Sequence, residues 1–296
     1  MKKVFSVLIF VLALAEMAGA QGIEGTAMSF SAVPGDIVSI SKGGADALQN
    51  PAARLFGKTD FDVQAAYASW GPKSGIKSNN INLDLFYKCS DKLAVTTALQ
   101  TFLGMPYVES ASAVQTKEFS PNDIMIKAGA AYKFTDNLSA GVNARYMSSS
   151  LSSSSSLSAF GADAHIAADF NGLRAMAGIC NIGTKVESAA GGSYSLPTSI
   201  LIAGGYSSEI PENGSIDTEI DVRYLLCGAL DLAAGIQYCW KDMLSVRAGY
   251  HKGAVYGDFL SLGAGVKFSG VKLDAAYLAG SGPLGGSLMF GLGYSF

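Results

Sequence analysis

The last ten residues of the chain alternate between two kinds of side chain. Even-numbered positions from Leu288 to Phe296 carry large apolar or aromatic residues, whereas odd-numbered positions from Ser287 to Ser295 carry serine, methionine or glycine. Because successive side chains of a β-strand point to opposite faces, one face of this segment is continuously apolar and the other is small. A strand of about ten residues with one apolar face suits a tilted crossing of a bilayer. The segment therefore predicts the final strand of a transmembrane β-barrel.

The same two-residue period extends back along the chain to residue 60. It predicts an all-β fold, an antiparallel transmembrane β-barrel of about 14 strands over residues 60–296. The expected strands are residues 61–70, 81–88, 93–102, 124–133, 138–147, 160–170, 173–182, 199–206, 216–225, 232–240, 244–251, 259–268, 271–278 and 287–296. Connections after even-numbered strands are mostly short, and those after odd-numbered strands, such as 103–123 and 148–159, are mostly longer. Outer-membrane barrels have this asymmetry, with short periplasmic turns and longer external loops.

Composition separates this fold from other classes. Hydrophobic residues make up 49% of the chain and charged residues only 15%, against roughly 25% charged residues in soluble domains. Beyond the N-terminus no apolar run is long enough for a membrane helix, which excludes a helical inner-membrane protein. The net charge of −3 argues against nucleic acid as a partner.

Residues 1–20 have the organisation of a Sec signal peptide. Lys2 and Lys3 are followed by an apolar stretch over 4–15 and by the small residues 18–20, which form a cleavage site before Gln21. The apolar stretch is too short to span a bilayer as a helix. The sequence thus predicts Sec export and a location in the outer membrane of a Gram-negative cell, where lipid surrounds the barrel.

Residues 21–59 do not alternate and are polar and rich in glycine. Residues 45–49 are compatible with a short helical turn that ends before Pro51, because the residue preceding a proline disfavours the helical region. A segment of this kind before a barrel either hangs in the periplasm or folds into the lumen as a plug.

Charged and polar residues collect on the inward-facing positions of the predicted strands. An arginine or lysine facing lipid near the middle of the bilayer costs about 2–4 kcal/mol, so these positions identify the lumen. The predicted lumen cluster comprises Arg145, Asp163, His165, Glu219, Asp221, Arg223, Arg247 and Asp274. Because both signs are mixed, the favoured interpretation is that they pair with each other and with the N-terminal segment; the alternative is a polar permeation path.

The sequence offers little for catalysis or metal binding. It contains no nucleophile-elbow, zinc-protease or phosphate-loop motif, and only two histidines, His165 and His251. We expect no enzyme activity, no cofactor and no metal; the alternative is an enzyme that pairs one of these histidines with a serine. The four cysteines have long, irregular spacings, and small apolar residues are the favoured interpretation over one disulfide. They are Cys89, Cys180, Cys227 and Cys239.

Several motifs resemble a known superfamily. The N-terminal stretch 43–47, closed by Asn50-Pro51-Ala52, is similar to that of the FadL-like barrels. The second half resembles the PorV/PorQ branch of that superfamily through segments in the same order, at 196–200, 244–250, 260–266 and 273–277, and through the aromatic end at Tyr294 and Phe296.

The resemblance implies a fourteen-stranded barrel whose N-terminal segment enters the lumen, with Asn50, Pro51 and Ala52 as a plug-anchoring motif and no catalytic residues. It implies one of two functions: type IX protein secretion, with secretion-system components or cargo as partners, or FadL-like passive uptake of a hydrophobic ligand. Tyr294 and Phe296 resemble the signal by which the barrel-assembly machinery recognises outer-membrane proteins.

Overall fold

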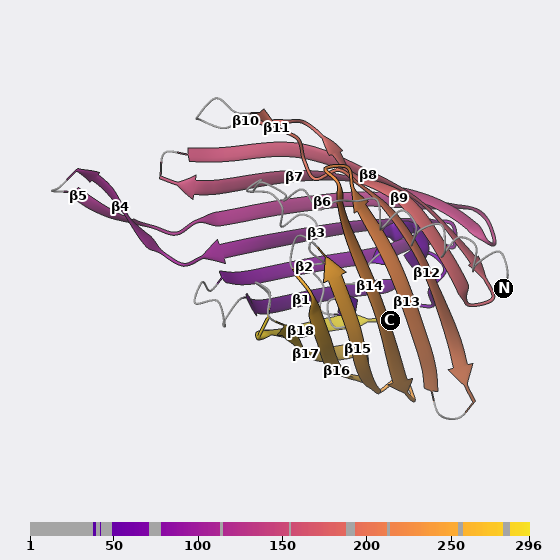
Figure 1. Ribbon diagram of the computed structural model, residues 1–296. Coiled ribbons are helices and arrows are strands. Elements are labelled where there is room, and N and C mark those ends of the chain that lie inside the picture. The colour runs from indigo at the N-terminus through magenta and orange to yellow at the C-terminus, as the bar shows by residue number, and fades with distance from the viewer. Residues whose placement is uncertain are drawn as a thin grey trace.

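The computed structural model describes residues 38–39, 42, 49–70, 78–112, 115–153, 155–187, 193–211, 214–253, 257–280 and 285–296. Within these ranges, fourteen strands form one closed barrel (Figure 1). Each barrel strand pairs antiparallel with the next one along the chain, and the first, β1, pairs with the last, β18. The predicted fold class is confirmed.

The strand positions also agree with the two-residue period. The barrel strands are β1 (Phe61–Trp70), β2 (Ser78–Ser90), β3 (Leu93–Gly104), β6 (Asn122–Thr135), β7 (Leu138–Ser152), β8 (Ser155–Phe170), β9 (Leu173–Gly183), β12 (Ser199–Ile210), β13 (Gly214–Leu225), β14 (Ala229–Trp240), β15 (Leu244–Gly253), β16 (Phe259–Phe268), β17 (Val271–Gly280) and β18 (Ser287–Ser295). The largest difference from the expected strands is at the serine-rich connection 148–159. Most of it is strand rather than loop, because β7 and β8 continue pairing from Ser148–Ser158 to Ser152–Ser155.

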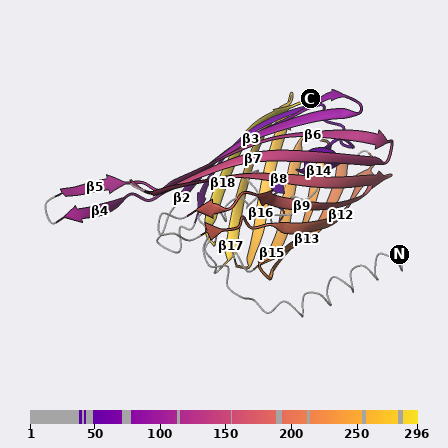
Figure 2. The ribbon, with the colours of Figure 1, turned by 90° about the horizontal axis from the view of Figure 1, so that it is seen from above.

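Two small hairpins lie in connections for which the sequence predicted only loops. They are β4 (Tyr107–Ser112) with β5 (Gln115–Phe119), and β10 (Val186–Glu187) with β11 (Ser193–Tyr194). The β4–β5 hairpin projects well beyond the barrel rim (Figure 2). Among the described residues, no helix is both long and apolar enough to cross a bilayer.

The two faces of the barrel wall differ as the alternation predicts. In β18 the even positions are exposed and the odd positions are buried along the whole strand. Large apolar side chains on the outside of other strands, such as Val142, Ile166 and Leu262, complete a band around the barrel. In water such a surface would be an unstable patch, but in a bilayer it contacts hydrocarbon.

The barrel closes between its first and last strands, and Phe296 takes part in the closure. The backbone N–H of Phe61 donates to the Phe296 carbonyl at 3.0 Å, and the N–H of Phe296 donates to the Phe61 carbonyl at 3.1 Å. The two rings are stacked with centroids 5.3 Å apart. Short turns at this end use left-handed residues, as at Asn171 (φ 56°) and Gly172 (φ 88°), which suits two-residue hairpin turns.

The described helix, α3 (Pro51–Arg54), lies later than the expected helical turn, of which residues 45–48 fall outside the described residues. Asn50 is extended (φ −68°, ψ 157°), as expected for a residue before proline, and Pro51 lies in the first turn of α3, where its missing N–H costs nothing. Asn50 caps the helix: its side-chain oxygen accepts from the N–H groups of Ala52 at 2.9 Å and Ala53 at 3.1 Å.

The wall's orientation toward lipid can be tested with one strand. Val142 lies in the middle of the membrane-crossing part of β7 and is 58% exposed, whereas Leu138 lies on the same face at the periplasmic end. We expect Val142→Arg to lower the free energy of unfolding by about 2–4 kcal/mol and Leu138→Arg by only about 0–1 kcal/mol. Urea titration of the barrel in phospholipid vesicles measures both, and equal losses would contradict this placement.

Candidate functional site in the barrel lumen

The helix α3 is packed inside the barrel near its periplasmic end. Ala52, Ala53 and Leu55 are buried against a cluster of apolar side chains from the wall. The cluster's wall members are Phe86, Ala94, Ala131, Ala167, Met176, Leu201 and Ala203. The Ser139 hydroxyl donates to the Ala52 carbonyl at 2.8 Å, which satisfies an acceptor at the end of the helix.

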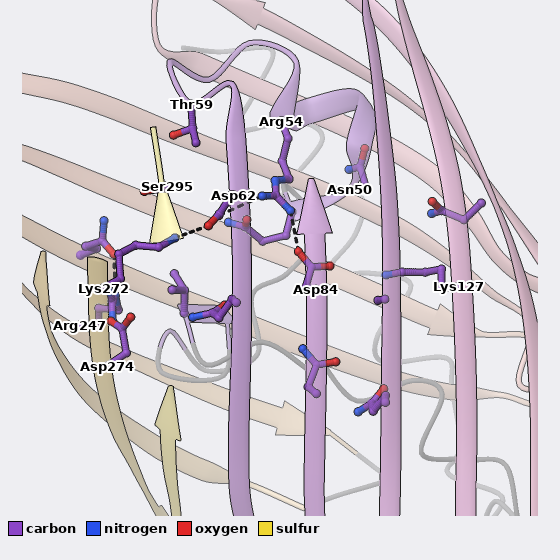
Figure 3. Close-up of a pocket in the computed structure, with 18 of the residues that line it drawn as sticks. Asn50, Arg54, Thr59, Asp62, Asp84, Lys127, Arg247, Lys272, Asp274 and Ser295 are labelled. Carbon is purple, nitrogen blue, oxygen red and sulfur yellow. Dashed lines mark hydrogen bonds and ion pairs between the residues drawn. The ribbon is translucent and has the colours of Figure 1, made fainter. Parts of the chain in front are cut away.

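Arg54, the last residue of α3, ties the helix to two strands. Its guanidinium donates to Asp84 of β2 at 3.0 Å and to Asp62 of β1 at 3.1 Å, and it lies 4.2 Å from the centroid of the Phe86 ring. Asp62 also accepts from Lys272 of β17 at 2.5 Å. Figure 3 shows this line of charges running from β17 through β1 to β2. Arg54 therefore links α3 directly to β1 and β2, and Asp62 extends this link to Lys272 of β17.

Two further ion pairs link the N-terminal segment to the opposite wall. The Lys42 ammonium donates to Glu219 of β13 at 2.8 Å, and both side chains are buried. The Lys42 backbone lies so close to Gly235 that a Cβ there would meet it at 2.4 Å, so this contact requires glycine. Lys58 forms an exposed ion pair with Glu209, and this hydrogen bond and charge raise the pKa of Lys58.

A polar cavity of about 370 Å³ occupies the lumen beside these contacts. Its lining includes Asp242 and Met243, which form a turn at the periplasmic end, and reaches inward to Arg145 and His165. The walls are amides, carboxylates and cations drawn from many barrel strands (Figure 3). The periplasmic half of the barrel thus contains a polar cavity beside the apolar cluster that holds α3.

Arg145 and Asp163 form a buried ion pair at the inner end of this cavity. The other Asp163 oxygen accepts the backbone N–H of Asn181 at 2.9 Å, and Arg145 also donates to the Asn181 side chain at 2.7 Å. Asn143 donates to Asp163 at 3.4 Å. A buried ion pair is favourable only when further hydrogen bonds satisfy both partners, and Asn181 supplies them here.

Asn181 is the residue that sequence reasoning missed. The pairing of β8 with β9 shifts between Ala162 and Ala164, so that Cys180 and Asn181 both lie opposite Asp163 in a β-bulge. Asn181 has φ 58°, a left-handed conformation that asparagine tolerates better than most residues. Its side chain also donates to the Pro197 carbonyl at 3.3 Å. The sequence feature that could have identified this residue is that an asparagine interrupts the alternation of β9.

The remaining predicted lumen residues lie on the inner face at separate places. Arg247 of β15 and Asp274 of β17 form an ion pair at 2.6 Å, and Arg247 also donates to Gln237 at 2.6 Å. Asp221 is buried two residues along β13 from Glu219, and Arg223 lines the cavity. The structure therefore brings together Arg145 with Asp163 and Arg247 with Asp274, rather than one continuous cluster.

The two histidines lie in different environments. The Nε2 atom of His165 is 3.5 Å from the Cys180 sulfur, and no serine hydroxyl hydrogen-bonds to His165 in the described part of the chain. His251 stacks on Phe259 with centroids 4.8 Å apart, near the outer end of the barrel. All four cysteines lie in the described part of the chain, and none of them forms a disulfide there.

Two apolar clusters lie in the outer half of the lumen, beside buried polar side chains such as Asn80, Asp231 and His251. We call the two clusters together the outer apolar layer. Their buried members are Ala66, Ala68, Phe259, Ala276, Leu278 and Met289 in one, and Met125, Met147, Ala159, Val186 and Leu196 in the other. Phe102 packs against both clusters. The outer half of the lumen therefore combines apolar clusters with buried polar groups.

The Arg145–Asp163 pair yields a stability prediction. We expect Arg145→Met to cost about 3 kcal/mol, because it leaves the Asp163 carboxylate buried without its cation. The double variant Arg145→Met/Asp163→Leu should recover most of that loss, since no unpaired charge remains. Urea titration of the three proteins measures this, and a double variant as unstable as the single one would contradict it.

Comparisons with known proteins place this lumen in context. The toluene transporter TodX of Pseudomonas putida superposes with a TM-score of 0.61 at 11% identity, covering 89% of this chain and 98% of TodX. The CymD monoaromatic hydrocarbon channel superposes with a TM-score of 0.57 at 13% identity, covering 90% of this chain and 98% of CymD. At these identities the likeness concerns the fold. No curated protein matches the chain.

The family described as type IX secretion system protein PorV matches residues 26–230, more than half of the sequence. Together with the closed barrel and its lipid-facing band, this match shows that the chain is an outer-membrane β-barrel and belongs to the PorV family.

Proposed function

We propose that this protein is a non-enzymatic component of type IX protein secretion at the outer membrane, with secretion-system components or cargo as its partners. The match to PorV over residues 26–230 carries the proposal. The interior supports it: Arg54, Lys42 and Ser139 link the N-terminal segment to the wall on several sides. Because these links hold the N-terminal segment inside the lumen, the barrel is better suited to be a rigid platform for other proteins than a wide pore.

The outer surface offers a place for such partners. The β4–β5 hairpin extends away from the rim as an isolated two-stranded ribbon (Figure 2). Two-stranded ribbons are marginally stable alone, and their free edges pair readily with other strands. The hairpin is therefore a suitable contact site for a secretion partner outside the membrane.

Deleting the gene tests this function directly. We expect surface proteins that bear C-terminal sorting domains to be lost from the cell surface and to return when the intact gene is supplied. Quantitative proteomics of the surface and periplasmic fractions measures this. A second strain, in which residues 107–119 are replaced by a short turn, tests the hairpin. Unchanged surface proteins in the deletion strain would rule out the secretion role.

A second candidate function is passive uptake of hydrophobic molecules, and the outer apolar layer favours it. Apolar side chains at the outer entrance of a barrel are suited to an apolar solute, and the fold is that of hydrocarbon channels. The same deletion strain separates the two functions. Slower uptake of radiolabelled toluene with normal surface proteins would favour the channel, whereas normal uptake would exclude it.

We further propose how the chain is exported and assembled. Residues 1–20 direct Sec export and are removed, so that the mature protein begins at Gln21. Residues 21–59 act as a plug anchored by Asn50, Pro51 and Ala52. Tyr294 and Phe296 form the recognition signal for the barrel-assembly machinery; their exposure on the outer face of the wall supports this role.

The assembly proposal gives a further prediction. Removing Phe296 takes away the backbone and ring contacts with Phe61 as well as the terminal aromatic. We expect less folded barrel in the membrane, measured as the heat-modifiable band on a gel, while Phe296→Tyr keeps an aromatic and assembles normally. Normal assembly without residue 296 would contradict this role.

A further inference from the structure

The charges around the lumen cavity do not balance. Its lining contains seven cationic side chains, from Arg54, Lys127, Arg145, Arg223, Arg247, Lys267 and Lys272, against five aspartates at 62, 84, 163, 242 and 274. All five aspartates already have cationic partners among the lining residues. Among the lining residues the cations therefore outnumber the carboxylates by two.

Lys127 is one of the two lining cations that pair with none of these five aspartates; the other, Arg223, has an interaction partner. The Lys127 ammonium forms no hydrogen bond or ion pair with any residue that the structure describes, and Figure 3 shows the side chain extending from β6 into the cavity. Directly across the strand pair lies Arg145, another cation, whose charge is already matched by Asp163. Like charges opposite each other in a sheet repel, so an anion beside Lys127 would relieve this repulsion.

Two buried amide groups lie on β1 and β3, and each has an Nε2 atom without a partner in the described part of the chain. The Nε2 atoms of Gln64 on β1 and Gln100 on β3 are buried without a hydrogen-bond acceptor among the described residues. The two side chains are only 7% and 1% exposed, and both line the cavity. Buried donors are normally satisfied, by protein or by a bound molecule. A partner for either Nε2 group must be a hydrogen-bond acceptor, because an amide nitrogen only donates.

The strand register places these groups in one row. Gln100 lies directly opposite Asn82 of β2, and Ala98, two residues from Gln100 on the same face, lies opposite Lys127. Gln64 is the diagonal neighbour of Asn82 across β1 and β2. Diagonal neighbours are about 7–8 Å apart, within reach of long side chains. Gln64, Asn82, Gln100 and Lys127 thus lie at neighbouring positions on four adjacent strands, which we call the amide–lysine row. Asp84 lies within this row, directly opposite both Gln64 and Ala98, and its carboxylate accepts from Arg54 at 3.0 Å.

We propose that the amide–lysine row is a binding site for a small anionic solute that enters from the periplasm. Lys127 would neutralise a carboxylate or phosphate group, while the amides of Gln64 and Gln100 donate to its oxygens. The cavity volume of about 370 Å³ falls within the range of about 300–1,000 Å³ typical of small-molecule sites. The turn residues Asp242 and Met243 in the lining put the entrance on the periplasmic side.

Calorimetric titration of the purified full-length barrel in nanodiscs tests this site. The probes are succinate and inorganic phosphate in separate titrations, with maltose as a neutral solute of similar polarity. We expect saturable binding of at least one anion, weakening as salt rises, and none of maltose. Binding of succinate alone assigns a carboxylate ligand, and binding of phosphate alone assigns a phosphate ligand. No saturable binding of either anion, or equal binding of maltose, would overturn the proposal.

Matched variants locate the site. Lys127→Met should weaken anion binding at least tenfold, and Gln100→Leu should weaken it severalfold. The control is Lys133→Met, which removes the same charge from the same strand at a lysine that lies 5.8 Å from the Phe56 ring and outside the cavity lining. Heat-modifiable migration confirms that each variant is folded. Equal losses in Lys127→Met and Lys133→Met would show that the anion responds only to net charge and would overturn the site.

Discussion

The structure depends on the need to pair every backbone N–H and C=O group within the hydrocarbon layer, where water is absent. An open sheet would leave two unpaired edges in lipid, so a strand-based span must close on itself. The pairing of β1 with β18 provides that closure, and the two-residue alternation follows from it. Once the sheet is closed, each strand has one face toward lipid and the other toward the lumen, and every charged residue must be placed on the second.

Confining charge to the lumen creates a second requirement, because buried charges must be paired. The structure meets it locally, with Arg145 against Asp163, Arg247 against Asp274, and Arg54 shared between two aspartates. Several of these partners come from different strands or from the N-terminal segment. The ion pairs therefore hold the interior in one arrangement. Lys127 differs from the other cations because it forms no ion pair with any carboxylate in the described part of the chain.

Much of the fold could be predicted because the two faces of a membrane barrel require different kinds of side chain, which alternate along each strand. Alternation along segments such as 287–296 gave the strands, and the cost of charge in lipid gave the lumen face. Pairing within the lumen was harder to predict, because the partner of Arg247 is set by register across β15, β16 and β17. The bulge at Asn181 interrupts the two-residue period on which the prediction depended, and the short helix was expected before Pro51, whereas α3 begins at this residue.

The contact between Phe61 and Phe296 joins segments that are 235 positions apart in the numbering. Contacts this distant in sequence carry a large loop-closure entropy and form late. The barrel consequently cannot close while only part of the chain is present. One edge of the first strand stays unpaired until the last strand is available to pair with it. During that wait the edge needs protection from aggregation, which makes a chaperoned passage through the periplasm a consequence of the strand order itself.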